Sequence, residues 1–370
     1  MTGGEYAFLA RGFGSGVAFV FAWSRMTVIQ TGAIAAVAFV FGDYANQVWP
    51  AGANGPALYA ALSVVALTAL NVAGTMQTKA LQRVMETALI AGLLVLAAGG
   101  VLVGGEGRPA PAGGPGGSFG LAMMFVLFTY GGWNEAAYLA GEVRDAPRNM
   151  MRILVIGIVS VTALYLVVNV GYLAALGLGG MRESKAVAVD VMRLVAGDQG
   201  ALVLALIVCI SAFTTINAAI FTGARTTWAF GRDFPLLRGL GRWRASGSSP
   251  ANALLLQGAA TLALVLAGSF TPDGFSAMVA YTSPVFWTFF LLTGVTLFLM
   301  RARSAERPAF RVPLYPAVPL AFCAMCLYML FRSVEYVRNP VFGPKFGAMV
   351  LAGIAVMAVG IPLYFFCRKK

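Results

Sequence analysis

The chain of 370 residues is 59% hydrophobic and only 11% charged, with a mean hydropathy of +0.80. Soluble domains carry about 25% charged residues, so this composition excludes a water-soluble protein and indicates one embedded in a membrane. The net charge of +12 does not indicate nucleic-acid binding, because the chain offers no polar domain to carry a basic face. With no histidine and with four cysteines that all lie in apolar segments, we expect neither a metal site nor a cofactor.

Long uncharged runs recur along the chain and predict an all-α membrane protein of about ten transmembrane helices. Each run reaches the roughly 20 residues that a helix needs to cross a bilayer. The runs do not alternate in polarity as barrel strands would, so helices are the structure that pairs their backbone groups in lipid. In chain order the expected spans are about 14–42, 56–74, 84–104, 119–140, 152–177, 200–225, 250–269, 275–300, 314–334 and 346–366.

The segments between the spans are short, and none is long enough to hold a soluble domain. Residues 1–12 have no basic n-region, apolar h-region or cleavage site, so they form neither a signal peptide nor a complete span. The Gly/Pro-rich residues 104–118 read as a flexible loop, and residues 185–197 as a short amphipathic helix lying on the membrane surface. We therefore expect a single transmembrane domain over residues 1–370.

Lysine and arginine fall mainly on one side of these spans, which predicts the orientation of the chain. The cluster from Arg225 to Arg244 and the one from Arg301 to Arg311 lie on the same side as the C-terminal Arg368, Lys369 and Lys370. Cytoplasmic loops retain positive charge. We therefore expect a multi-pass protein of the cell (plasma or inner) membrane with both termini in the cytoplasm.

The fourth span contains two glycines flanked by polar and aromatic groups, Thr129-Tyr130-Gly131-Gly132-Trp133-Asn134. Unwound backbone at this depth is tolerated where it lines a cavity, and free helix ends suit the carboxylate and ammonium of a substrate. Two glycines also permit close helix packing, and the spacing alone does not separate the two interpretations.

Two ionisable residues, Arg25 and Glu135, lie inside predicted spans. A charge at the bilayer centre costs at least about 2.5 kcal/mol, so such residues usually face a cavity or each other. Glu135 is a candidate proton-coupling carboxylate with Arg25 as a candidate partner. A static ion pair or a water-facing position is the alternative.

The segment LFTYGGWNEAAYLAGEVRDAPRNMMR (127–152) resembles the sixth-helix signature of the amino acid-polyamine-organocation superfamily, closest to its L-type amino acid transporter branch. GGEYAFL resembles that family's loop after the second helix, and SAFTTINAAIFTGARTTWAFGRD resembles its eighth helix and following loop. The resemblance implies a fold of two inverted five-helix repeats with broken first and sixth helices. On this alignment the chain corresponds to helices three to twelve, so we expect an N-terminal truncation that removes half of the substrate site.

The resemblance also implies roles for individual residues. Phe128 matches the aromatic gate, and Tyr130, Gly131 and Gly132 match the unwound stretch that meets the substrate's amino group, with Trp133 and Asn134 following in register. Packing against lipid or core is the alternative for Phe128 and Trp133. In the sixth span, four polar residues would line the substrate or ion site if that helix packs against the broken one, or would only bond to the preceding turn: Ser211, Thr214, Thr215 and Asn217.

The function that these features predict is secondary active transport of an amino acid, which we expect to be neutral, by alternating access. Exchange and proton symport both remain open, and so does sodium as the coupling ion. Many relatives carry a lysine in the fifth helix that stands in for sodium, whereas the matching residue here is Leu89. A non-transporting remnant or a membrane assembly subunit is the alternative. We expect no enzyme, because intramembrane proteolysis needs paired aspartates or histidines, and Asp43 stands alone at a span end.

Overall fold

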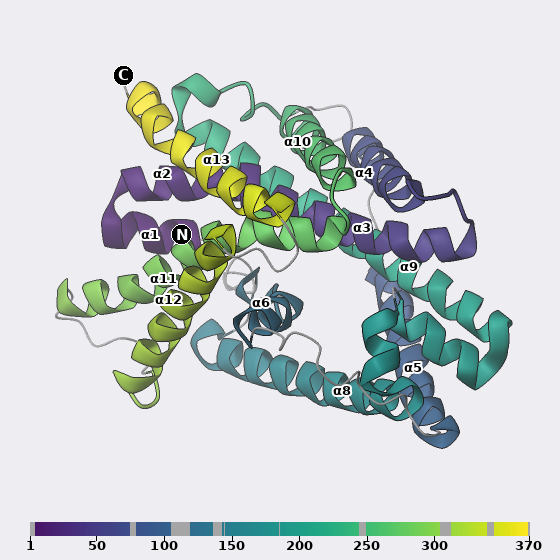
Figure 1. Ribbon diagram of the computed structural model, residues 1–370. Coiled ribbons are helices and arrows are strands. Elements are labelled where there is room, and N and C mark those ends of the chain that lie inside the picture. The colour runs from purple at the N-terminus through teal and green to yellow at the C-terminus, as the bar shows by residue number, and fades with distance from the viewer. Residues whose placement is uncertain are drawn as a thin grey trace.

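The computed structural model describes residues 4–74, 79–104, 119–135, 143, 145–184, 186–243, 249–303, 312–338 and 344–368. These residues are almost entirely helical, which confirms the predicted all-α membrane fold (Figure 1). The helices are α1 (Gly4–Phe13), α2 (Ser15–Ser24), η1 (Arg25–Ile29), α3 (Gln30–Val48), α4 (Gly55–Ala73), α5 (Lys79–Val103), α6 (Phe119–Thr129), η2 (Trp133–Glu135), α8 (Ala146–Glu183), α9 (Val187–Asp233), η4 (Pro235–Leu237), α10 (Ala251–Ser269), α11 (Gly274–Arg303), α12 (Ala317–Arg338) and α13 (Pro344–Arg368).

The predicted spans compare closely with these helices. Within the described ranges, nine helical segments are long and apolar enough to cross a membrane, the first being α2, η1 and α3 joined over Ser15–Val48. The predicted fourth span, 119–140, is not among the nine, because its helix α6 ends at Thr129. Its last residues, 136–140, and the predicted loop at 105–118 lie outside the described residues.

Two segments that connect the predicted spans are helical. The segment that resembled a loop, residues 3–9, is helical from residue 4 onward in α1, so that expectation was wrong. The predicted short helix at 185–197 is present as the first part of α9. A kink at Ala196 and Gly197 separates it from the rest of α9. Its position on a membrane surface stays a prediction.

Helices α1 and α2 form a hairpin, so α1 lies alongside α2, the first part of the span Ser15–Val48 (Figure 1). Gly14, which separates them, has φ +90°, a conformation that side chains rarely adopt, so the chain reverses there. Because the two helices have equal length, the first turn of α1 returns to the level of η1. The hairpin thereby places Glu5 beside Arg25.

Three of the apolar clusters among the described residues meet at α11, which runs through the bundle. One large cluster joins α3, α4, α9 and α10 to α11, and another joins α6, α12 and α13 to it. A third cluster packs α1, α2 and η1 against α11 around Leu9 and Phe289. In Figure 1, α6 lies in the middle of the view, between α12 and α8. The broken span therefore lies where these groups of helices come together.

Candidate functional site

The fourth predicted span is broken at its glycines, which confirms the helix-break interpretation. Helix α6 ends at Thr129, and a turn over residues 130–132 leads into the short 3-10 helix η2. The amide of Gly131 donates to the carbonyl of Phe128 at 2.9 Å, which tightens the last turn. Gly132 has φ +96°, a conformation that is open to glycine at little cost. The break therefore follows from the sequence.

Helix α8 holds the break in place from one side. The hydroxyl of Tyr130 donates to Oγ1 of Thr162 at 3.1 Å, and its ring packs edge-on against Tyr165 with centroids 5.2 Å apart. The hydroxyl of Tyr165 donates to the carbonyl of Thr129 at 3.2 Å. A carbonyl at the end of α6 thus has a partner from α8, as a helix end in a membrane requires.

Two aromatic residues flank the break and pack against different parts of α11. Phe128 meets Phe275 edge-on at 5.8 Å and joins the large cluster of α3, α4, α9 and α10. Trp133 meets Phe290 edge-on at 5.6 Å, yet 42% of its surface stays exposed. The break thus has one aromatic residue that is partly buried against the core, Phe128, and one that is more exposed, Trp133.

The feature that links the break to the rest of the bundle is a charged cluster formed by Glu5, Arg25, Asn134 and Glu135. Nη2 of Arg25 donates to both carboxylate oxygens of Glu135 at 2.8 and 2.9 Å. Nη1 of Arg25 lies 3.4 Å from Oε2 of Glu5. The amide of Asn134 donates to the other oxygen of Glu5 at 3.0 Å. The cluster joins three elements, α1, η1 and η2.

The burial of the charged cluster shows why these groups meet. Arg25 and Glu5 are 5% and 6% exposed, whereas the side chain of Glu135 is 41% exposed. An ionised group that loses its water needs charged and hydrogen-bonding partners in return. The sequence anticipated that Arg25 and Glu135 would face a cavity or each other, and the structure pairs them. It did not identify Glu5, because only the α1–α2 hairpin brings that residue into contact.

The π-helix η1 presents Arg25 to the cluster. A π-helical turn is rare, is wider than an α-helical one and is frequent at functional sites. Within η1, Arg25 contacts α1 and η2. Gln30, the first residue after η1, donates to the carbonyl of Ala219 in α9 at 2.9 Å. One local distortion thus directs two polar side chains of one span toward different neighbours.

The four predicted polar residues of α9 stand apart from the break in their hydrogen bonding. The hydroxyls of Thr214 and Thr215 donate to the carbonyl of Ser211 in their own helix, at 2.8 and 2.9 Å. Asn217 accepts from Asn71 of α4 at 2.6 Å. Among the described residues, the hydrogen bonds of these side chains reach α4 and α9 itself. Of the residues at the break, Phe128 packs against the apolar cluster that contains their neighbour Ile216.

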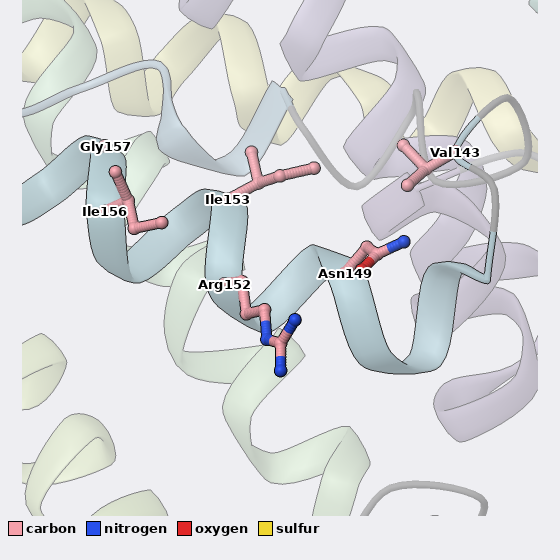
Figure 2. A pocket seen from close by; sticks show the side chains of 6 residues that line it. All are labelled: Val143, Asn149, Arg152, Ile153, Ile156 and Gly157. Carbon is pink, nitrogen blue, oxygen red and sulfur yellow. The ribbon is translucent and has the colours of Figure 1, made fainter.

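A pocket of about 530 Å³ opens at the start of α8, near the predicted cytoplasmic side. Figure 2 shows five of its residues on α8 and Val143 on the segment before it. Arg152 and Asn149 are its polar members, and the described residues that line it include none of the predicted substrate residues. We therefore place the candidate site at the break and not in this pocket.

A bundle of apolar helices with one predicted span broken by a turn and a buried ionic cluster against the break is typical of a class of protein, the polytopic membrane transporters. A family model described as amino acid permease matches residues 1–362. The chain belongs to the amino acid permease family.

Named relatives agree with this family. The chain is similar to "b(0,+)-type amino acid transporter 1" of Mus musculus, at 28% identity over 90% of this chain and 69% of the relative. It is similar to "Large neutral amino acids transporter small subunit 2" of Oryctolagus cuniculus, at 26% over 98% of this chain and 68% of the relative. It is also similar to "Serine/threonine exchanger SteT" of Bacillus subtilis, at 23% over the whole chain and 82% of the relative. These relatives support the predicted superfamily and its L-type branch.

Proposed function

We propose that this chain carries amino acids across a cell membrane by secondary active transport, with the substrate bound at the break between α6 and η2. The observation that carries the proposal is the break itself, in a chain that belongs to the amino acid permease family. Residues 1–370 then form one transmembrane domain that corresponds to helices three to twelve of the family, with both termini in the cytoplasm.

The break offers groups that suit an amino acid. Its turn, residues 130–132, lies outside a regular helix, the amides of Tyr130 and Gly131 donate to carbonyls of α6, and helix ends attract charged substrate groups. The exposed Trp133 and the edge-on Phe128 supply apolar surface for an uncharged side chain. We therefore propose a neutral amino acid as substrate, with Phe128 as the aromatic gate and residues 130–134 as its binding stretch.

The polar residues of α9 have a secondary place in this proposal. Ser211, Thr214, Thr215 and Asn217 bond within α9 or to α4. They would reach the substrate only in a conformation that brings α9 closer to the break. Alternating access requires two such arrangements of the helices around one site. The charged cluster, which ties η2 to α1 and η1, is the contact that we propose to couple this motion to an ion.

Reconstitution into proteoliposomes tests the function. A form of the chain extended upstream by two helices should take up labelled neutral L-amino acids when unlabelled substrate is present inside, and the 370-residue chain is measured in parallel. Uptake should saturate and should discriminate against the D-enantiomer, while empty liposomes give the background. If both forms bind and transport no amino acid, the chain is an assembly subunit or a remnant and the proposal fails.

A further inference from the structure

The last carbonyls of α6 are the part of the break that suits a positively charged group. The final carbonyls of a helix lack intrahelical partners and carry a partial negative charge. In α6, the carbonyl of Phe128 accepts from the amide of Gly131 at 2.9 Å. The next carbonyl, that of Thr129, accepts from the hydroxyl of Tyr165 in α8 at 3.2 Å. One carbonyl at the break is thus held by a side chain from another helix.

The register of α8 directs Tyr165 to the break. Helix α8 packs on α5 and α9 through Leu164 and Val168, and Tyr165 lies about 100° around the helix from Leu164. Its ring meets that of Tyr130 edge-on at 5.2 Å. The hydroxyl of Tyr130 donates at 3.1 Å to Thr162, which lies one turn before Tyr165 on α8. Thr162 and Tyr165 therefore form a polar stripe of α8 that contacts the break.

The ammonium group of an amino acid is a better donor to the carbonyl of Thr129 than a phenol hydroxyl is. Hydrogen bonds in which one partner is charged are about twice as strong as neutral ones. The negative end of the α6 dipole attracts a cation further. To reach this helix end, an ammonium group must enter the space where the hydroxyl of Tyr165 lies, 3.2 Å from the carbonyl oxygen. Substrate and Tyr165 therefore compete for one place.

We propose that Tyr165 is a competing donor at the substrate site. Its hydroxyl holds the carbonyl of Thr129 in the arrangement seen here and yields that carbonyl to the ammonium group of the substrate. The proposal rests on the proposed function, in which the amino acid binds at the break. The exchange transfers no proton and breaks no covalent bond, because one donor replaces another at the same oxygen.

The displacement of Tyr165 connects substrate binding to α8. Of the nine candidate spans among the described residues, the one in α8 has the smallest buried share, so little packing opposes a movement of this helix. Its contacts with the break, from Thr162 and Tyr165, are side-chain contacts that can be exchanged. Tyr165 is thereby a positioning residue, which ties α8 to α6 until the substrate takes its place.

Binding measurements on Tyr165→Phe test the competition. The variant keeps the ring and removes the hydroxyl, so the substrate no longer displaces a donor. In the form extended upstream by two helices, the dissociation constants of labelled L-leucine and L-serine should fall by about threefold to tenfold, as expected for one neutral hydrogen bond. Incorporation of 3-fluorotyrosine at position 165, whose more acidic hydroxyl is a stronger donor, should raise them.

Tyr172→Phe is the matched control. Tyr172 lies two turns further along α8 and packs into the cluster of α5, α8 and α9, so loss of its hydroxyl should leave both dissociation constants unchanged. In proteoliposomes, the KM for exchange should fall in Tyr165→Phe by the same factor as the dissociation constant, while the maximal rate stays nearly constant. Thermal denaturation in detergent shows that each variant is folded.

The sign of the change separates competition from a structural role. If Tyr165 only stabilises the break, Tyr165→Phe should bind substrate more weakly. A dissociation constant that is unchanged or larger in Tyr165→Phe, in a protein whose wild type binds, overturns the proposal and leaves the proposed function standing. If the wild type binds no neutral amino acid, the proposed function fails and the competition fails with it.

Discussion

At the scale of single residues, two phenylalanines one turn apart on α6 allow the proposed gate role of Phe128 to be separated from a packing role. Phe125 stacks on Phe275 with centroids 6.2 Å apart, and Phe128 meets the same ring edge-on at 5.8 Å. Phe125 packs into the cluster of α11, α12 and α13, whereas Phe128 lies two residues before the turn that opens the helix. Both contribute aromatic contacts to one neighbour, so their stabilising roles are similar. Their positions relative to the break differ.

We therefore expect Phe128→Ala to reduce amino acid uptake per folded molecule by about tenfold, and Phe125→Ala to leave it nearly unchanged. An aromatic pair contributes roughly 0.5–1.5 kcal/mol, and about 1.4 kcal/mol corresponds to tenfold in affinity. Both variants should show a similar loss of thermal stability, which makes Phe125→Ala the matched control. Equal uptake by the two variants in proteoliposomes would remove the gate role from Phe128.

At the scale of elements, the break between α6 and η2 depends on one backbone conformation. A Cβ built on Gly132 would meet no atom within 4 Å, so space is not what selects glycine there. Its φ of +96° is the requirement, since side chains rarely adopt that region. The turn between α6 and η2 therefore depends on the backbone conformation of Gly132.

Replacing Gly132 by alanine should destabilise the break by roughly 1–2 kcal/mol, because the left-handed region places Cβ too near a carbonyl oxygen. Gly157→Ala in α8 is the control: Gly157 also has open space around its Cβ position, but its conformation is helical, so alanine should stabilise the helix there. Thermal denaturation in detergent, read for both variants, checks this. Equal stability of the two variants would mean that the turn tolerates side chains.

At the scale of the whole molecule, α9 connects the two sides of the membrane. From Asp198 to its end at Asp233 it runs for about 50 Å at 1.5 Å per residue, which exceeds the roughly 30 Å hydrocarbon core. We therefore expect its two ends to emerge on opposite sides. The distribution of arginines predicts that the end near Arg242 lies in the cytoplasm.

Cysteine labelling in intact cells should confirm this orientation. Asp198→Cys should react with a membrane-impermeant maleimide from outside, and Arg242→Cys should react only after the membrane is opened. The native thiols, Cys209, Cys323, Cys326 and Cys367, are all buried, so the parent chain serves as the unlabelled control. The reverse pattern would invert the predicted topology.

The sequence was sufficient for features that depend on local physics and insufficient for those that depend on topology. Spans followed from length and polarity, and the break followed from Gly131 and Gly132 beside polar groups at bilayer depth. Arg25 and Glu135 were identified because burying an isolated charge is costly. Glu5 was not, because it lies in a first turn that resembled a loop, and its contact with Arg25 arises from the hairpin at Gly14. Whether the polar groups of α9 face the break likewise depends on helix packing that no spacing reveals.

The π-helical turn at residues 25–29 has a consequence for insertions and deletions in this gene. Such a turn accommodates a residue beyond the α-helical repeat, so deleting one residue there would let the span close into continuous α-helix. Every side chain before the deletion would then turn by about 100° relative to those after it. Arg25 and Gln30 could no longer keep α1 and α9 as their respective partners. A single-codon deletion in this turn would consequently be far more damaging than one in the exposed residues 50–54, which join α3 to α4.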